Sequence, residues 1–195
     1  MPDLVNPNPD SIDPGVADPD SGKRVRSFQT RRRKLPHWEE AGNVYFLTWA
    51  TAHRTSLSPE ERTLALQAIL HWDRVRWRVY AAVVMPDHVH ALVQPLPVGG
   101  NGAAGCHALG AIVHSVKSYS AHQVNRRRRA TGPVWQAERE DRIVRNEYEF
   151  WQKWEYIRNN PVKDSLAPSA EEYPWFYQQS GLEKDSGGTP VLLDG

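Results

Sequence analysis

Two histidines interrupt an apolar run near the middle of this 195-residue chain. The segment 85–93 has the sequence MPDHVHALV, in which one valine separates His88 from His90. Side chains two residues apart on a β-strand project from the same face, so Val89 and Ala91 would project from the other face. The pattern therefore predicts a strand with one apolar face and one face that carries two imidazoles.

Two imidazoles on one strand face supply half of a divalent-metal site. Because two ligands are too few to hold a metal firmly, a third must come from another element of the fold. Phosphate oxygens and water can fill the open positions of such a site. The spacing alone leaves a second interpretation open, in which His88 and His90 are partly exposed surface residues.

Hydrophobic periodicity and turn residues predict an α+β domain. The segment Ser58-Pro59-Glu60-Glu61 has the spacing of a helix start with a capping box, and Asn160-Pro161 is expected to end the last helix. The β-α-β-β-α order favours a ferredoxin-like antiparallel sheet with helices packed on it. The expected strands are 43–53, 77–85 and 88–96, the expected helices are 58–75, 107–129 and 146–159, and the expected irregular segments are 133–140, as a loop or short extended stretch, and 171–178, as coil.

Charge is distributed unevenly along the chain, although the net charge is only +1. Residues 1–22 contain five Asp and no Lys or Arg, whereas 23–34 contain seven basic residues. We expect a disordered acidic head and basic arm at 1–34, one domain at 35–178 and a flexible tail at 179–195. The basic body indicates a polyanionic partner.

Cysteine content and hydropathy exclude several classes of protein. The single Cys106 cannot build an intramolecular disulfide framework or a cysteine metal cluster. No run of 18 apolar residues is present, so no transmembrane helix is expected, and the N-terminus lacks the apolar region of a signal peptide. A cytoplasmic protein without membrane contact is the expectation.

The helix expected at 107–129 carries a hydroxyl and an amide one turn apart. Tyr119 lies at the edge of its apolar stripe and Gln123 lies four residues later, so the two side chains are neighbours on the helix surface. Tyr119 taken alone fits a ring at the edge of the core with its hydroxyl in water. Gln123 needs a polar partner within the apolar stripe, and a metal could be that partner.

Four motifs in order resemble the single-tyrosine HUH transposases, and specifically the REP-associated tyrosine transposases. The resemblance covers about residues 37–178. The matching motifs are Val84 to Leu92 (VMPDHVHAL), Gly132 to Gln136 (GPVWQ), Tyr156 to Lys163 (YIRNNPVK) and Glu172 to Trp175 (EYPW).

The resemblance implies a ferredoxin-like fold of the HUH endonuclease type, a homodimer in many members, and cleavage of single-stranded, hairpin-forming repeat DNA. It implies that His88, His90 and Gln123 bind Mg²⁺ or Mn²⁺. It also implies that Tyr119 attacks the scissile phosphate to give a 5′-phosphotyrosine link and a free 3′-hydroxyl. Tyr148 and Tyr156 are alternative hydroxyls that are more simply interpreted as packing residues.

Two basic clusters favour DNA as the polyanion, and nearby aromatic rings could stack on unpaired bases. A solvated charged face is the alternative for both clusters. A non-catalytic nucleic-acid-binding module and an unrelated metal-dependent hydrolase remain competing functions. The arginines expected to contact DNA are Arg31, Arg32, Arg33, Arg126, Arg127, Arg128 and Arg129.

Overall fold

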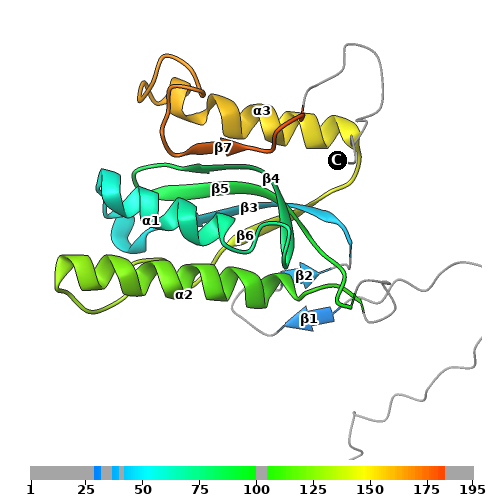
Figure 1. Cartoon of the computed structure of the whole chain (residues 1–195), viewed down its shortest axis with the longest axis horizontal. Coiled ribbons are helices and arrows are strands. Elements are labelled where there is room, and N and C mark those ends of the chain that lie inside the picture. The colour runs from blue at the N-terminus through cyan, green and yellow to red at the C-terminus, as the bar shows by residue number, and fades with distance from the viewer. Residues whose placement is uncertain (1–28, 32–36, 40–41, 100–104, 183–195) are drawn as a thin grey trace, which may run out of the picture.

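The computed structural model describes residues 29–31, 37–39, 42–99 and 105–182 (Figure 1). Most of the expected head, arm and tail therefore lies outside the described residues, including Arg32 and Arg33. No helix in these ranges is long and apolar enough to cross a membrane. The elements are β1 (Gln29–Arg31), β2 (His37–Glu39), β3 (Val44–Ala50), the 3-10 turn η1 (Ala52–Arg54), α1 (Pro59–Leu70), β4 (Trp77–Val84), β5 (His88–Pro95), α2 (Leu109–Arg128), β6 (Glu140–Val144), α3 (Glu147–Lys163) and β7 (Phe176–Gln178).

A five-stranded antiparallel sheet forms the centre of the molecule, in the order β6-β3-β5-β4-β7. The hairpin β4–β5 is present as expected, and β3 pairs with β5 so that Thr48 lies opposite His90 and Ala50 lies opposite His88. The predicted α+β class with an antiparallel sheet is therefore confirmed.

Helices cover both faces of the sheet (Figure 1). The side chains of Val89, Ala91 and Val93 pack against α1 and α2 in one core. Leu92 packs in a second core against α3, which covers the opposite face. Because alternate residues of a strand face opposite ways, His88 and His90 project on the α3 side.

One local expectation is confirmed in detail, and two are wrong. The Ser58 side chain caps α1 and Glu61 returns a hydrogen bond to the Ser58 backbone, which completes the capping box. Residues 176–178 form an edge strand rather than the expected coil, since their backbone completes a ladder with β4. Residues 140–144, which lie almost wholly beyond the expected irregular segment 133–140, form the other edge strand by pairing with β3. Pro161 does not end α3, because the helix continues through it to Lys163.

Candidate functional site

The two histidines of β5 form a compact pair beneath α3. Their ring centroids lie 4.8 Å apart and the rings meet edge to face. His90 is buried, with 5% of its surface exposed, while the side chain of His88 is 18% exposed. The predicted common face of the two imidazoles is therefore confirmed, and the surface interpretation does not hold for His90.

Each imidazole is held through its Nδ1 atom. Nδ1 of His88 lies 2.6 Å from a carboxylate oxygen of Asp87, whose other oxygen lies 3.2 Å from the Arg54 guanidinium. Nδ1 of His90 lies 2.8 Å from the hydroxyl of Thr48 on the neighbouring strand. Within the described part of the chain neither Nε2 has a hydrogen-bond partner, so each ring can offer a nitrogen lone pair to a cation. Such partners fix the orientation and tautomer of metal-binding histidines.

The charge state of the pair suits cation binding. Burial, with smaller contributions from the nearby His88 and Lys153 charges, lowers the pKa of His90 to about 3. Burial raises the pKa of Asp87, but its hydrogen bonds with His88 and Arg54 outweigh that effect and leave the pKa below its usual value. At neutral pH His90 is therefore a neutral ligand and Asp87 is an ionised acceptor.

Helix α3 places a tyrosine against the histidines. The Tyr156 ring centroid lies 5.0 Å from that of His90 and 5.8 Å from that of Phe46, and the Phe46 ring also stacks on His90 at 5.5 Å. Tyr156 remains 45% exposed, so it contacts the imidazole and also meets solvent. Tyr156 is therefore the tyrosine that the structure brings to the histidine pair.

Two further α3 side chains lie one turn from Tyr156. Asn160 follows it by four residues and is only 6% exposed. Lys153 precedes it by three residues, and its ammonium nitrogen lies 5.0 Å from the centroid of the Phe46 ring. Residues three and four apart share a helix face, so both side chains belong to the surface that meets the sheet.

Tyr119 and Gln123 lie on α2, on the other face of the sheet. Val113 and Val116 of the same helix pack with Val89, whose side chain is directed away from the histidines. Within one chain the sheet therefore separates Tyr119 and Gln123 from His88 and His90, and the predicted common site is corrected. Periodicity identified a helix with an exposed tyrosine, but it could not identify the sheet face that the helix covers.

No group of three or more His, Cys, Asp or Glu side chains suited to a metal occurs within the described ranges. A cation at the histidine pair would therefore need oxygen ligands from another source. The amide of Asn160, water and a substrate phosphate are ligands of the right chemistry for Mg²⁺ or Mn²⁺.

The arginines at the end of α2 have different environments. Arg128 forms two hydrogen bonds to the carboxylate of Glu61, at 2.6 and 2.7 Å, and this carboxylate is nearly buried. Arg127 lies 3.5 Å from Glu60 in a solvent-exposed pair. Arg128 therefore stabilises the junction of α1 and α2, and its predicted contact with DNA stays a prediction. Arg31 belongs to β1, and the structure does not describe its side chain.

Arg128→Ala is expected to lower the free energy of unfolding by about 3 kcal/mol, because it leaves the Glu61 carboxylate buried without its partner. Arg127→Ala is the matched control and should cost less than about 1 kcal/mol, because both members of its ion pair are more than half exposed. Urea unfolding of both variants measures the difference. An equal decrease in the free energy of unfolding for both variants would show that the Arg128–Glu61 pair contributes no more to stability than the exposed Arg127–Glu60 pair.

The same ion pair gives a pH dependence. The hydrogen bond from Arg128 is the largest influence on Glu61 and lowers the pKa of its carboxyl, against the opposing effect of burial. A carboxyl whose pKa is lower in the folded state than in the unfolded state stabilises the protein at pH values above its unfolded-state pKa. This stabilisation is lost as the pH falls through its folded-state pKa. The Arg128→Ala variant should therefore lose less stability than the wild type on acidification below about pH 4.5.

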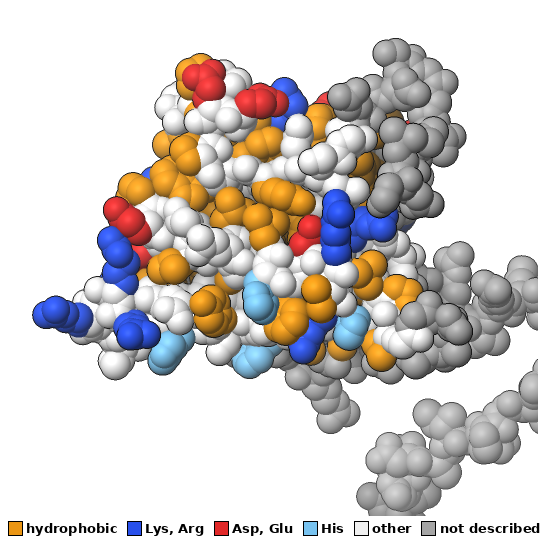
Figure 2. Space-filling view, in the orientation of Figure 1, with side chains coloured by type: hydrophobic (Ala, Val, Ile, Leu, Met, Phe, Trp, Pro, Cys, Tyr) orange, Lys and Arg blue, Asp and Glu red, His pale blue; other side chains and the backbone are white. Residues whose placement is uncertain are grey.

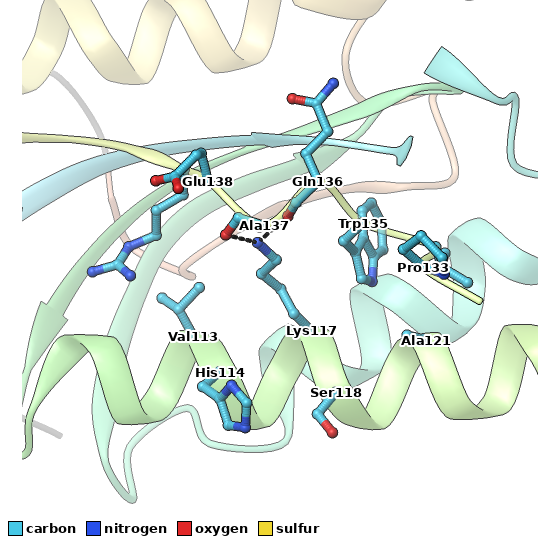
Figure 3. A pocket seen from close by; sticks show the side chains of 12 residues that line it. Val113, His114, Lys117, Ser118, Ala121, Pro133, Trp135, Gln136, Ala137 and Glu138 are labelled. Carbon is cyan, nitrogen blue, oxygen red and sulfur yellow. Dashed lines mark hydrogen bonds between the residues drawn. The ribbon is translucent and has the colours of Figure 1, made fainter. Parts of the chain in front are cut away.

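A groove of about 730 Å³ lies between α2 and the segment 133–139 (Figure 3). The Lys117 ammonium crosses it and donates to the backbone carbonyls of Gln136 and Ala137, at 2.7 and 3.2 Å. Lys117 thus fastens this segment to the helix. The groove is on the α2 side of the sheet, away from the histidine pair.

Comparison with known proteins identifies the fold. The structure aligns with that of a REP-associated tyrosine transposase bound to a REP hairpin, with a TM-score of 0.57 and 22% sequence identity over 76% of this chain and 81% of that chain. The chain has the fold of a REP-associated tyrosine transposase. A candidate transposase from Deinococcus radiodurans R1 aligns with a TM-score of 0.41 and 21% identity over 66% of this chain and 95% of that chain. No family model and no curated protein sequence matches the chain.

The transposase-like fold gives a context for residues that sequence reasoning assigned to packing or did not single out. Tyr156, Thr48 and Lys153 act on His90 directly, and Asn160 lies one helical turn after Tyr156. The sequence signal that points to Tyr156 and Asn160 is the 156–163 motif, in which these two residues have the same four-residue spacing as Tyr119 and Gln123.

Proposed function

We propose that this protein is a single-stranded DNA nicking and joining enzyme of the transposase type, with Tyr156 as its nucleophile. The observation that carries the proposal is the contact between Tyr156 and His90, whose ring centroids lie 5.0 Å apart on one face of the sheet. A half-exposed phenol beside two imidazoles with open Nε2 atoms matches the needs of nucleophilic attack on a bound phosphate.

The reaction exchanges one phosphoester bond for another. The Tyr156 oxygen forms a bond to the phosphorus as the bond from phosphorus to the 3′-oxygen breaks. The phenol loses its proton and the departing 3′-oxygen gains one, which leaves a 5′-phosphotyrosine and a free 3′-hydroxyl. Attack by a 3′-hydroxyl on the phosphotyrosine reverses these bonds and joins strands.

His88 and His90 would hold Mg²⁺ or Mn²⁺ through their Nε2 atoms, with Asn160 as the third protein ligand in place of Gln123. A bound divalent cation polarises the phosphate and stabilises the charge that develops on it. The amide of Asn160 lies one turn from the nucleophile, so one helix positions both groups. Lys153 on the same face supplies a cation that would favour a phosphate near the histidines.

The proposed substrate is single-stranded DNA that folds into hairpins. The solved structure with the same fold holds a REP hairpin, and this chain has basic residues at the end of α2. His88, His90 and Tyr156 meet within one chain, so the proposed chemistry needs no second copy. The homodimer implied by the motifs stays a prediction, which sedimentation of the purified protein would test.

Binding to single-stranded hairpin DNA is expected to weaken by about 10- to 100-fold between 50 and 200 mM salt, because each phosphate contact releases condensed counterions. Fluorescence anisotropy with a labelled hairpin measures the slope, and a plain duplex of equal length is the comparison. Affinity that is independent of salt would contradict phosphate contacts.

The direct test is a covalent adduct. Incubation of the protein and Mg²⁺ or Mn²⁺ with end-labelled hairpin DNA should give a labelled band that survives denaturation. Binding without an adduct would favour the non-catalytic nucleic-acid module, and cleavage without an adduct would favour a metal-dependent hydrolase.

A further inference from the structure

The exposed face of α2 carries basic side chains and no carboxylate. The helix contains no Asp or Glu between Leu109 and Arg128. Its free cations gather at the C-terminal end, where Arg126 and the capping residue Arg129 form no ion pair with any described residue. Figure 2 shows blue and pale-blue side chains along the lower edge of the molecule, where α2 lies.

A pocket of about 270 Å³ opens between α1 and α2, about halfway along this face. Tyr119 forms one side of it and is 55% exposed, so its ring is accessible from solvent. Trp72, His71, Gln67 and Ser115 line the remainder. Aromatic rings and polar groups around a space of this size suit a flat, polar, aromatic ligand.

The aromatic wall of the pocket is rigid. The indole N–H of Trp72 donates to the Ser115 hydroxyl at 3.2 Å, and the Arg76 guanidinium lies over the indole at 3.8 Å from its centroid. The His71 ring meets the Trp72 ring edge to face at 4.6 Å. A preorganised wall of this kind lowers the entropic cost of ligand binding.

We propose that this face of α2 is a second DNA-binding surface, in which an unpaired base enters the pocket and stacks on Tyr119 while phosphates contact Arg126 and Arg129. The inference rests on the proposed function, since it needs DNA as the substrate. Bases of any sequence stack on aromatic rings, and a cationic track follows the backbone. The lack of carboxylates on α2 favours a polyanion over a basic or neutral partner.

Two hydrogen bonds link the C-terminal end of α2 to the loop that precedes the histidines, although the helix covers the opposite face of the sheet. Arg128 at the end of α2 donates to the backbone carbonyl of Ser56, and the N–H of Leu57 donates to the carbonyl of Pro86, which precedes Asp87 and His88. From Tyr119 to Arg129 the helix rises about 15 Å, a length that about four phosphates of one strand span. DNA that leaves the histidine site could therefore continue along α2.

Tyr119→Ala is expected to weaken DNA binding about five- to 100-fold through the loss of stacking, whereas Tyr119→Phe should bind within twofold of the wild type. The probe is a fluorescein-labelled DNA hairpin with a randomised ten-nucleotide single-stranded tail, followed by anisotropy. Tyr148→Ala removes another tyrosine, 72% exposed on α3, and should also bind within twofold.

The double variant Arg126→Ser, Arg129→Ser should reduce the salt slope of binding by about one, and Arg145→Ser is its control.

Unchanged affinity of Tyr119→Ala, or an equal loss in Tyr119→Phe, would overturn the stacking site. Melting temperatures of all variants should stay near that of the wild type, because these side chains are exposed. If the wild type binds the hairpin and forms its adduct while Tyr119→Ala is indistinguishable from it, only the second surface fails. If the wild type does not bind the hairpin, the proposed function and this inference fail together.

Discussion

Tyr156→Phe is expected to bind hairpin DNA as tightly as the wild type and to form no covalent adduct. The substitution keeps the ring that contacts His90 and Phe46 and removes only the oxygen that would attack the phosphate. Loss of a nucleophile lowers turnover on the order of 10³-fold or more. Strand cleavage, adduct formation and anisotropy on the same preparation separate chemistry from binding.

Tyr119→Phe is the matched control for this experiment. Tyr119 is also a helical tyrosine with a polar residue four positions later, but the sheet lies between it and the histidines. Its variant should cleave DNA and form the adduct within twofold of the wild type. Loss of the adduct in Tyr119→Phe with retention in Tyr156→Phe would contradict the assignment of the nucleophile.

Removal of either histidine is expected to abolish cleavage. His88→Ala and His90→Gln each remove one imidazole nitrogen from the proposed cation site, and the loss of a metal ligand should reduce activity at least 100-fold. Gln is preferred at position 90 because the site is buried and stacked against Phe46, so that truncation to Ala would leave a cavity. Circular dichroism should confirm that both variants remain folded.

Binding of Mn²⁺ to the protein without DNA gives an independent measurement. Titration calorimetry should show weaker binding in both histidine variants, and about 10- to 100-fold weaker binding in Thr48→Val, which removes only the partner of the His90 Nδ1 atom. Ser169→Ala, a remote hydroxyl variant, is the control. Wild-type cleavage by the double histidine variant in Mg²⁺ or Mn²⁺ would contradict a histidine-bound cation.

The central part of the fold was predictable because its signals are local. Alternation in β5 placed the histidines on one face, and the capping box at Ser58 located the start of α1. The edge strands β6 and β7 were not predictable from these signals, because both are short and their structure depends on the ladders with β3 and β4. Tertiary pairing decides the conformation of such segments.

The proposed nucleophile was harder to predict from the sequence than the histidine pair. Both α2 and α3 carry a tyrosine followed four residues later by an amide. Helical periodicity does not indicate which face of the sheet each helix covers. The contact between Tyr156 and His90 links residues 66 positions apart in the chain, so only the fold could reveal it. The arginine run at the end of α2 posed a similar problem, because Glu61 is distant in sequence from its partner Arg128.

The most direct test of the account maps the protein–DNA link to a residue. The adduct formed with hairpin DNA is trapped by denaturation, digested with nuclease and protease, and analysed by tandem mass spectrometry. The account predicts a nucleotide on the peptide that contains Tyr156. A nucleotide on Tyr119 or Tyr148 would contradict the proposed active site, and the absence of any tyrosine-linked nucleotide would contradict covalent catalysis by this protein.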